Sequence, residues 1–251
     1  MQDVWAAGEA YEPYIGRWSR LVADKFLAWL SVPAGSRCLD VGCGTGAVTS
    51  KLARIGEATG IDASEGFVAY AAEHVPEASF RVGDAAALPF EEDTFDAAVS
   101  GLVLNFVPDH AAMVSEMRRV TAPGGTVAAY VWDYAEGMEL LRRFWDVAAA
   151  LDPELPDEAA RFPVCALEPL AALFSGAGLA DVEGRAIVVP TTFVDFDDFW
   201  LPFLGAQGPA PTYLASLPAE HQATLRDRLH EQLGDGPIRL TARAWAVRGT
   251  A

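Results

Sequence analysis

The 251-residue sequence predicts an α/β fold in which a doubly wound, mostly parallel sheet carries helices on both faces. Strand-like and helix-like segments alternate over residues 36–132, which is typical of βαβ units. The first predicted strand ends in a glycine-rich turn at residues 42–46, and a helix-compatible segment follows. An acidic residue also stands at the carboxyl end of each of the first three predicted strands. Ligands bind at the carboxyl ends of the strands in such sheets, so these observations predict one shared site there.

An amphipathic helix is expected before the sheet, between Tyr14 and Leu30. Apolar residues recur there at helical spacing, among them Trp18, Val22 and Phe26. We then expect strands at residues 36–41, 57–62, 78–82, 95–100 and 125–132, and helices at residues 46–55, 65–74 and 109–121.

The pattern becomes less regular after Trp132. We expect helices at residues 137–151 and 166–178, a strand at 182–190, an aromatic segment rich in aspartates at 193–204, an amphipathic helix around Leu225–Leu233 and a closing strand at 238–247. No internal repeat or low-complexity linker divides the chain. The later segments therefore read as insertions that cap one domain.

The glycine turn permits two interpretations. Gly42, Gly44 and Ala47 match the spacing of a dinucleotide fingerprint, and Asp62 stands roughly where that fingerprint expects an acidic ribose partner. Asp40 opposes this interpretation, because a carboxylate directly before the turn repels a pyrophosphate. S-adenosylmethionine carries no phosphate but does carry an ammonium and a sulfonium, so an acidic residue at Asp40 suits it.

With Asp40-Val41-Gly42-Cys43-Gly44-Thr45-Gly46, the chain resembles the class I S-adenosylmethionine-dependent methyltransferases, in particular the small-molecule, type 11-like group. The resemblance extends over roughly residues 36–132, and several motifs of the family occur in the family's order. These are Ile61-Asp62-Ala63-Ser64, Gly83-Asp84-Ala85, Leu88-Pro89-Phe90, the strand Thr94–Ser100, Arg118-Arg119-Val120 and Pro123-Gly124-Gly125.

The resemblance implies a Rossmann-like sheet of seven strands with an antiparallel last strand and a helical cap. It also implies one methyltransferase domain over residues 1–251. Within it we expect a helical lid at residues 1–35, a cofactor-binding core at 36–135, and insertions at 136–180 and 191–236 that form the cap and the acceptor pocket.

The cofactor implied by the resemblance is S-adenosyl-L-methionine, with S-adenosyl-L-homocysteine as product. In the family, the residue at the position of Asp62 binds the ribose hydroxyls and the residue at the position of Asp84 binds the adenine amino group. The leading helix of the family often closes over the cofactor. The expected cofactor-binding residues are Tyr14, Arg17, Asp40, Gly42, Gly44, Asp62, Ala63, Phe67, Asp84, Ala85, Ser100 and Gly101.

Aromatic residues after the fifth strand and in the insertions are expected to wall an acceptor pocket for a small organic molecule. They are Phe106, Trp132, Tyr134, Trp145, Phe199 and Trp200. Packing within the cap is the competing explanation for these side chains. Methyl transfer from a sulfonium depends mainly on positioning and the exclusion of water, so no conspicuous catalytic pair is required. The catalytic group stays open, with Asn105 and His110 as candidates, and no metal site is expected.

Composition argues against several partners. The net charge of −17 and the pI near 4.5 oppose nonspecific binding to nucleic acids and to anionic membrane surfaces. The sequence shows neither an apolar run long enough for a membrane helix nor a signal peptide, and its three cysteines lack metal-ligand spacing. We therefore expect a cytoplasmic enzyme acting on a small molecule, while the oligomeric state stays open.

Two further classes remain open beside methyl transfer. Some proteins of this fold keep the cofactor and catalyse a cyclisation or rearrangement, and others are noncatalytic cofactor-binding modules. The complete set of Asp40, Asp62 and Asp84 argues against loss of the cofactor but does not distinguish transfer from cyclisation. A nicotinamide-dependent oxidoreductase is the least favoured class, because of Asp40.

Overall fold

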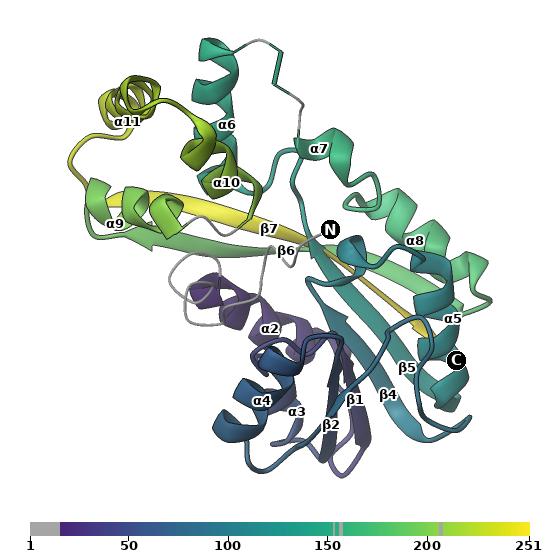
Figure 1. Ribbon diagram of the computed structural model, residues 1–251. Helices are drawn as coiled ribbons and strands as arrows, with labels where there is room; N and C mark the ends of the chain where they lie inside the picture. Colours follow the sequence, from purple (N-terminus) through teal and green to yellow (C-terminus); the bar gives the residue numbers. More distant parts are fainter. Residues whose placement is uncertain (1–15, 153, 156–157, 206–207) are drawn as a thin grey trace.

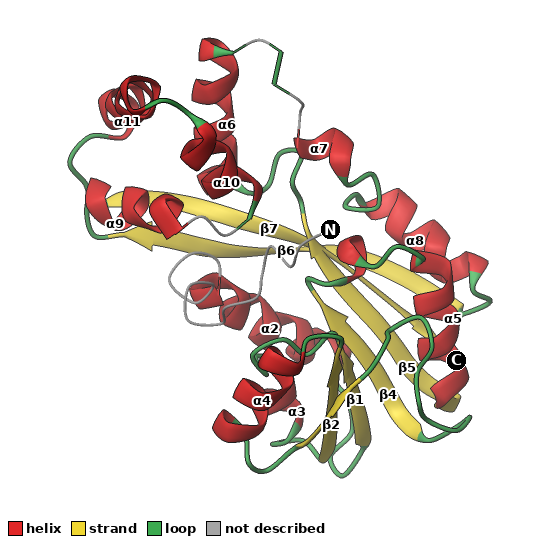
Figure 2. Cartoon of the chain, in the orientation of Figure 1, coloured by secondary structure: helices red, strands yellow, loops and turns green. Residues whose placement is uncertain are grey.

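The computed structural model describes residues 16–152, 154–155, 158–205 and 208–251, and its centre is a seven-stranded sheet (Figures 1 and 2). The strands are β1 (Arg37–Val41), β2 (Glu57–Asp62), β3 (Ser79–Val82), β4 (Phe95–Gly101), β5 (Thr121–Trp132), β6 (Ala180–Phe193) and β7 (Ile238–Thr250). Their order is β3-β2-β1-β4-β5-β7-β6. β1 to β5 pair in parallel, and β7 pairs antiparallel with both β5 and β6. The predicted fold class, including the antiparallel last strand, is confirmed.

The helices of the core cover both faces of this sheet (Figure 1). On one side lie α2 (Arg17–Leu30), α3 (Thr49–Leu52) and α4 (Glu65–His74), and on the other lie α5 (His110–Val120) and α8 (Leu167–Gly176). The central strands are buried on both faces, which explains why they read as short apolar runs rather than as alternating patterns. Side-chain caps fix the starts of α4 and α5: Ser64 accepts a hydrogen bond from the Phe67 amide, and Asp109 accepts one from Ala112.

The helix after the glycine turn is shorter than its pattern indicates. A helix is predicted at residues 46–55, but α3 covers only Thr49–Leu52. Gly46 has φ +86°, which lies outside the helical region, so the turn continues past it. Further along the chain, β6 and β7 are longer than predicted, because the two strands pair along almost their whole length.

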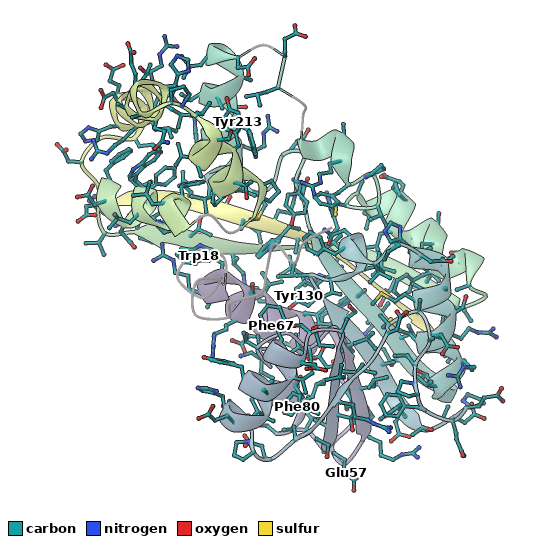
Figure 3. The ribbon with its side chains drawn as sticks, viewed as in Figure 1. Trp18, Glu57, Phe67, Phe80, Tyr130 and Tyr213 are labelled. Atoms are coloured by element: carbon teal, nitrogen blue, oxygen red, sulfur yellow. The ribbon has the colours of Figure 1, made fainter. Side chains whose placement is uncertain are left out.

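The long β6–β7 pair extends beyond the parallel core and carries a second group of helices (Figure 1). These are α6 (Glu139–Leu151), α9 (Phe196–Trp200), α10 (Pro209–Ser216) and α11 (Ala219–Leu233), together with the short 3-10 helix η3 (Leu201–Gly205). The short helix α7 (Glu158–Arg161) lies between this group and α8 (Figure 1). We call α6, α9, η3, α10 and α11 the cap. Phe144 of α6 stacks on Phe203 of η3, with ring centroids 4.7 Å apart, so the cap has an aromatic core of its own. In Figure 3, Tyr213 lies among the cap helices, away from Phe67 of α4 and Tyr130 of β5.

Candidate active site

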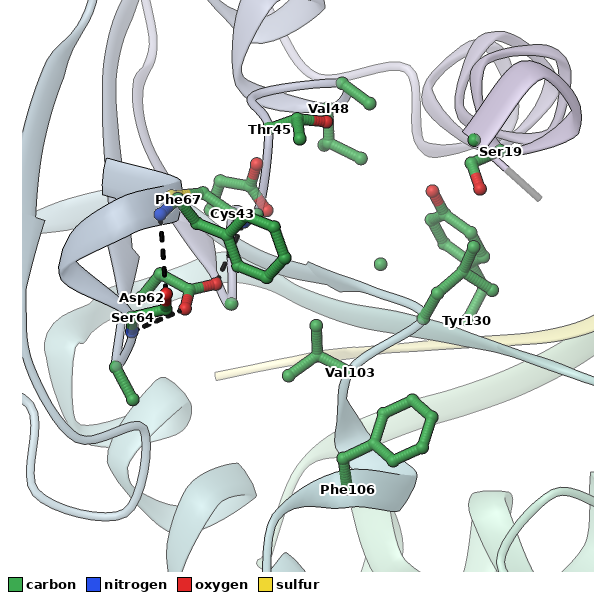
Figure 4. A pocket seen from close by; sticks show the side chains of 18 of the residues that line it. Ser19, Cys43, Thr45, Val48, Asp62, Ser64, Phe67, Val103, Phe106 and Tyr130 are labelled. Atoms are coloured by element: carbon green, nitrogen blue, oxygen red, sulfur yellow. Dashed lines mark hydrogen bonds between the residues drawn. The ribbon is translucent and has the colours of Figure 1, made fainter. Parts of the chain in front are cut away.

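A cavity of about 260 Å³ opens at the carboxyl ends of β1, β2, β4 and β5 (Figure 4). The glycine turn after β1 and the start of α4 form one end. The turn after β4 and the last residues of β5 form the other. This is the sheet edge at which a doubly wound sheet is expected to bind its ligand.

The glycine turn joins the two ends of this cavity. The Gly42 and Cys43 amides both donate to the carbonyl of Ile61, at 2.7 and 3.0 Å, so the turn is anchored to β2. Gly42 has φ +75°, and a Cβ atom there would lie only 2.4 Å from Cγ1 of Val103, in the turn after β4. Only glycine therefore fits at this position, for reasons of both backbone angle and space.

Asp40 lies under the glycine turn and is almost fully buried. Its Oδ2 accepts a hydrogen bond of 2.6 Å from the Thr49 hydroxyl, while its Oδ1 has no hydrogen-bond partner among the described residues. Burial raises the pKa of the Asp40 carboxyl to about 7, against the opposing effect of the Thr49 hydrogen bond. A buried carboxylate oxygen without a donor is costly, and a cationic ligand in the cavity reduces that cost.

Asp62, at the end of β2, connects the glycine turn to the start of α4. Its Oδ2 accepts from the Gly44 amide and its Oδ1 from the Ser64 amide, both at 2.9 Å (Figure 4). The side chain of Phe67, from the first turn of α4, also lines the cavity. This end therefore combines a fixed carboxylate, closely approachable backbone and one aromatic ring, a set that suits a nucleoside with vicinal hydroxyls.

The other end of the cavity is aromatic. Tyr130 and Trp132 stand two residues apart at the end of β5, and Tyr134 follows two residues beyond the strand; all three line the cavity together with Phe106. Phe162 extends this wall from the segment after α7: its ring centroid lies 5.4 Å from that of Phe106 and 5.1 Å from that of Tyr134.

An ion pair fixes the end of β5 between two of these aromatic residues. Asp133 is buried, and its Oδ2 accepts from Nε and Nη2 of Arg243 in β7, at 2.6 and 2.5 Å. The Asp133 amide also donates to the Arg243 carbonyl at 3.0 Å. Glu136 forms a second, exposed contact with the same guanidinium at 3.2 Å. Trp132 and Tyr134 are therefore held by a clamp to β7, a strand more than a hundred residues away along the chain.

Ten of the residues predicted for the site line this cavity. They are Asp40, Gly42, Gly44, Asp62, Ala63, Phe67, Gly101, Phe106, Trp132 and Tyr134. Tyr14 lies outside the described residues. Sequence reasoning missed Ser19, Val103 and Tyr130, which also line the cavity. Tyr130 could have been predicted from its spacing, because residues two positions apart in a strand face the same side of the sheet and Tyr130 stands two positions before Trp132.

Arg17, Asp84, Ala85 and Ser100 are not among the residues that line the cavity. Arg17 instead forms an ion pair of 2.9 Å with Asp198 of α9, and its guanidinium lies over the Trp18 ring. The Asp84 carboxylate is exposed and accepts a hydrogen bond from the Ala86 amide. The roles in cofactor binding expected for these residues stay predictions.

Three aromatic residues predicted for the acceptor pocket lie within the cap. Trp145 contacts Phe144 and Tyr213, while Phe199 and Trp200 contact Phe196 and Phe203. The helices that carry these residues stand on the projecting β6–β7 pair, beyond the parallel core (Figure 1). None of the three residues lines the cavity, and their role in an acceptor pocket stays a prediction.

Neither catalytic candidate lines the cavity. Asn105 is buried in η2 (Leu104–Phe106), and its amide nitrogen has no hydrogen-bond partner among the described residues. His110 is the first residue of α5 and is partly exposed. Within the described part of the chain, no cluster of three or more potential metal ligands occurs, and no helix is long and apolar enough to cross a membrane.

Comparisons of the sequence with known proteins identify methyltransferases. A family model described as a methyltransferase domain, type 11, matches residues 39–129. The demethylmenaquinone methyltransferase of Bacillus subtilis is 32% identical over 183 residues, which cover 64% of this chain and 78% of that enzyme.

Solved structures share the fold at low sequence identity. The YcgJ protein of Bacillus subtilis matches with a TM-score of 0.59 and 20% identity, covering 92% of this chain and 97% of that one. A phosphoethanolamine N-methyltransferase of Haemonchus contortus, crystallised with S-adenosyl-L-methionine, matches with a TM-score of 0.58 and 18% identity, over 98% of this chain and 56% of that one.

Proposed function

The chain belongs to the class I S-adenosylmethionine-dependent methyltransferases, and from that premise we propose that it methylates a small organic acceptor bound at the aromatic end of its cavity. The observation that carries the proposal is the division of one cavity into an acidic, glycine-rich end and an aromatic end. The first end suits a cationic nucleoside and the second an apolar molecule. The demethylmenaquinone methyltransferase relative, whose name indicates a small-molecule acceptor, supports the same class.

The residues of the acidic end fit the cofactor. We propose that Asp62 accepts hydrogen bonds from the ribose hydroxyls while its two amide contacts hold it in place. The Asp40 carboxylate, with one oxygen lacking a donor among the described residues, would stabilise the positive charge of the ligand. Gly42 and Gly44 allow close approach to the backbone, and Ala63, Phe67 and Gly101 complete the surface. When bound, S-adenosylmethionine supplies an activated methyl group on a positively charged sulfur.

The protein's own contribution is positioning and the exclusion of water. Val103 lies against Gly42, between the two ends of the cavity, and so limits how the acceptor and the donor approach each other. Tyr130, Trp132 and Tyr134 present an apolar wall, which favours a desolvated acceptor. An in-line displacement gains most from such alignment, since the donor needs no further activation.

The domain organisation follows the same proposal. Residues 36–135 would hold the cofactor, and residues 1–35 would act as a lid, since Gly16 and Ser19 line the cavity. The insertions at 136–180 and 191–236 would surround the entrance used by the acceptor. A reducing, cytoplasmic setting is proposed as well, because Cys38, Cys43 and Cys165 are all buried free thiols.

Calorimetry and a labelled-methyl assay test this function. We expect S-adenosylhomocysteine to bind and NADH not to bind. A panel of small metabolites incubated with methyl-labelled cofactor should then give one product heavier by a methyl group, together with one equivalent of S-adenosylhomocysteine. Binding of NADH in place of S-adenosylhomocysteine would refute the proposal.

The same assay separates the competing classes. A cyclase or rearrangement enzyme would convert its substrate without consuming the cofactor, so product would form with unchanged mass and no S-adenosylhomocysteine. A binding module would bind the cofactor and convert nothing. Either result, repeated over the panel, would replace methyl transfer as the function.

A further inference from the structure

The first turn of α2 forms part of the cavity wall but lacks the local features that usually fix the start of a helix. Gly16 and Ser19 line the cavity, and Ser19 is labelled in Figure 4. Gly16 occupies the N-cap position and offers no side-chain cap, and the first turn contains no acidic residue. It contains Arg17 and Arg20 instead, and positive charges are unfavourable at the positive end of the helix dipole. The position of this turn over the cavity therefore depends on contacts with other segments.

Arg17 connects this turn to the cap. Its Nη1 donates to Oδ1 of Asp198 in α9 at 2.9 Å, across 181 residues of the chain. The guanidinium carbon also lies 4.4 Å from the ring centroid of Trp18 and 4.8 Å from that of Phe193, at the end of β6. The side chains of Arg17 and Asp198 are 30% and 29% exposed, so salt screens this pair less than a pair on the open surface. The ion pair and the ring contacts both hold the first turn of α2 toward the cap.

Asp198 is itself fixed within the cap. Its Oδ2 accepts a hydrogen bond from the Val194 amide at 3.0 Å, and its own amide donates to Oδ1 of Asp195, the N-cap residue of α9, at 2.8 Å. Phe199, the next residue, is fully buried, and its ring centroid lies 5.6 Å from that of Phe203. Asp198 therefore presents Oδ1 to α2 from a fixed place at the aromatic core of the cap.

The other aspartates of α9 make different contacts. Asp195 caps the helix, and Asp197 pairs with Arg226 of α11 at 3.3 Å, with its side chain 69% exposed. Arg17 does not line the cavity, and its Nε and Nη2 are buried with no partner among the described residues. Arg17 therefore affects the cavity through its neighbours in the chain, which do line it.

We infer that Asp198 is a positioning residue for the cofactor, which acts through Arg17 to hold the first turn of α2 against the cavity. This inference rests on the proposed function, because it concerns the cofactor named there. It couples the cap to the cofactor end, although the described residues of the cap do not line the cavity. The coupling is reciprocal: an ion pair that strengthens cofactor binding is itself strengthened by the bound cofactor to the same degree.

Two neighbouring aspartates of α9 provide a matched test, in which calorimetry measures the affinity of the full-length protein for S-adenosylhomocysteine. Asp198→Asn removes the charge and keeps an oxygen for the Val194 amide, and it should weaken binding about fivefold, mainly through faster dissociation. Asp197→Asn removes the more exposed ion pair and should change the affinity less than about twofold. Equal effects of the two variants, or a loss of stability in Asp198→Asn without a change in affinity, overturn the inference.

A double variant separates this indirect role from a direct contact between Arg17 and the cofactor. Arg17→Met keeps an apolar stem and removes the charge, so it should weaken binding at least as much as Asp198→Asn. Adding Asp198→Asn to it should cause no further loss, because the shared contact is already absent. If the two losses instead multiply in the double variant, each residue acts alone and the inference is wrong.

Hydrogen exchange gives a readout that a purely structural contact would not change. The Val194 amide donates to Asp198 and reports on its position. S-adenosylhomocysteine should slow the exchange of this amide in the unaltered protein but not in Asp198→Asn. Equal slowing in both proteins, or none in either, contradicts the coupling. Failure of the unaltered protein to bind S-adenosylhomocysteine would instead refute the proposed function itself.

Discussion

The two ends of the cavity are built from different kinds of contact. At the cofactor end, Asp40, the glycine turn and Asp62 lie within 23 residues of one another and are joined by short hydrogen bonds to backbone amides and to Thr49. At the aromatic end, the rings come from the turn after β4, the end of β5 and the segment after α7, and a clamp to β7 holds them. The first end is organised locally, whereas the second depends on contacts between distant segments. This difference predicts that substitutions will affect the ends separately, except where the ends touch.

The largest effect is expected at Gly42, where the two ends touch. A Gly42→Ala side chain would overlap Val103 and would also require a left-handed backbone angle. We expect the free energy of unfolding to fall by about 2–6 kcal/mol, since strain and overlap each cost about 1–3 kcal/mol. Gly44→Ala is the control for stability: it needs a similar angle but meets no neighbouring side chain, so it should lower the free energy of unfolding by only about 1 kcal/mol. Unfolding in urea measures both, and equal losses would contradict the role assigned to the overlap.

The clamp at the aromatic end should affect stability and acceptor binding but not cofactor binding. Asp133→Ala leaves Arg243 without its buried partner, and we expect the free energy of unfolding in urea to fall by about 3 kcal/mol. The KM for the acceptor should rise as Trp132 and Tyr134 lose their anchor. Glu136→Ala removes only the exposed partner of the same arginine and should cost less than about 1 kcal/mol. If folded Asp133→Ala binds S-adenosylhomocysteine poorly as well, the two ends are not independent.

Substitutions of Asp62 and Asp84 compare the two acidic residues that the family resemblance assigns to the ribose and the adenine. Asp62→Ala should weaken S-adenosylhomocysteine by about 1–3 kcal/mol, because it removes a hydrogen-bonded carboxylate from the cavity wall. Asp84→Ala should weaken it less, because that carboxylate is exposed and outside the lining. Titration calorimetry decides between them. An equal or larger effect of Asp84→Ala would support the adenine contact expected from the family.

The smallest expected effect is a proton release at Asp40. Burial raises the pKa of this carboxyl from 3.8 to about 7, so the folded protein retains a proton that the unfolded chain loses. Its contribution to stability is therefore greatest below about pH 4 and declines as the pH rises from about 4 to 7. S-adenosylmethionine carries a sulfonium, which favours the ionised carboxyl, so binding of S-adenosylmethionine near pH 7 should release protons and strengthen as the pH rises.

Calorimetry in two buffers with different ionisation enthalpies measures this proton release. Asp40→Asn is the control, because it removes the titrating group while keeping a similar shape. The release should disappear in that variant. Proton uptake in the unaltered protein, or an unchanged release in Asp40→Asn, would show that another group titrates.

The sequence predicted the cofactor end well because its signals are local. Ser64 and Asp109 cap the helices that their positions predict, and consecutive parallel strands must end at the same edge of the sheet. Asp40 and Asp62 therefore lie beside the glycine turn whatever structure the later segments of the chain adopt. The same region contains one wrong prediction, the start of the helix after the turn. The residues there are compatible with a helix, and this pattern does not reveal the left-handed backbone angle of Gly46.

By itself, then, the sequence determined the fold class, including the antiparallel last strand implied by the family resemblance, and a carboxylate pair beside the glycine turn. Only the tertiary structure decided the aromatic end. It turned Arg17 toward Asp198, packed Trp145, Phe199 and Trp200 inside the cap, and brought Phe162 against Phe106 and Tyr134. Which rings meet depends on how β6 pairs with β7 and on where the segment after α7 packs, and local sequence patterns predict an element's type but not its partner. A side chain's type indicates that it will be buried, but contacts between distant segments determine where.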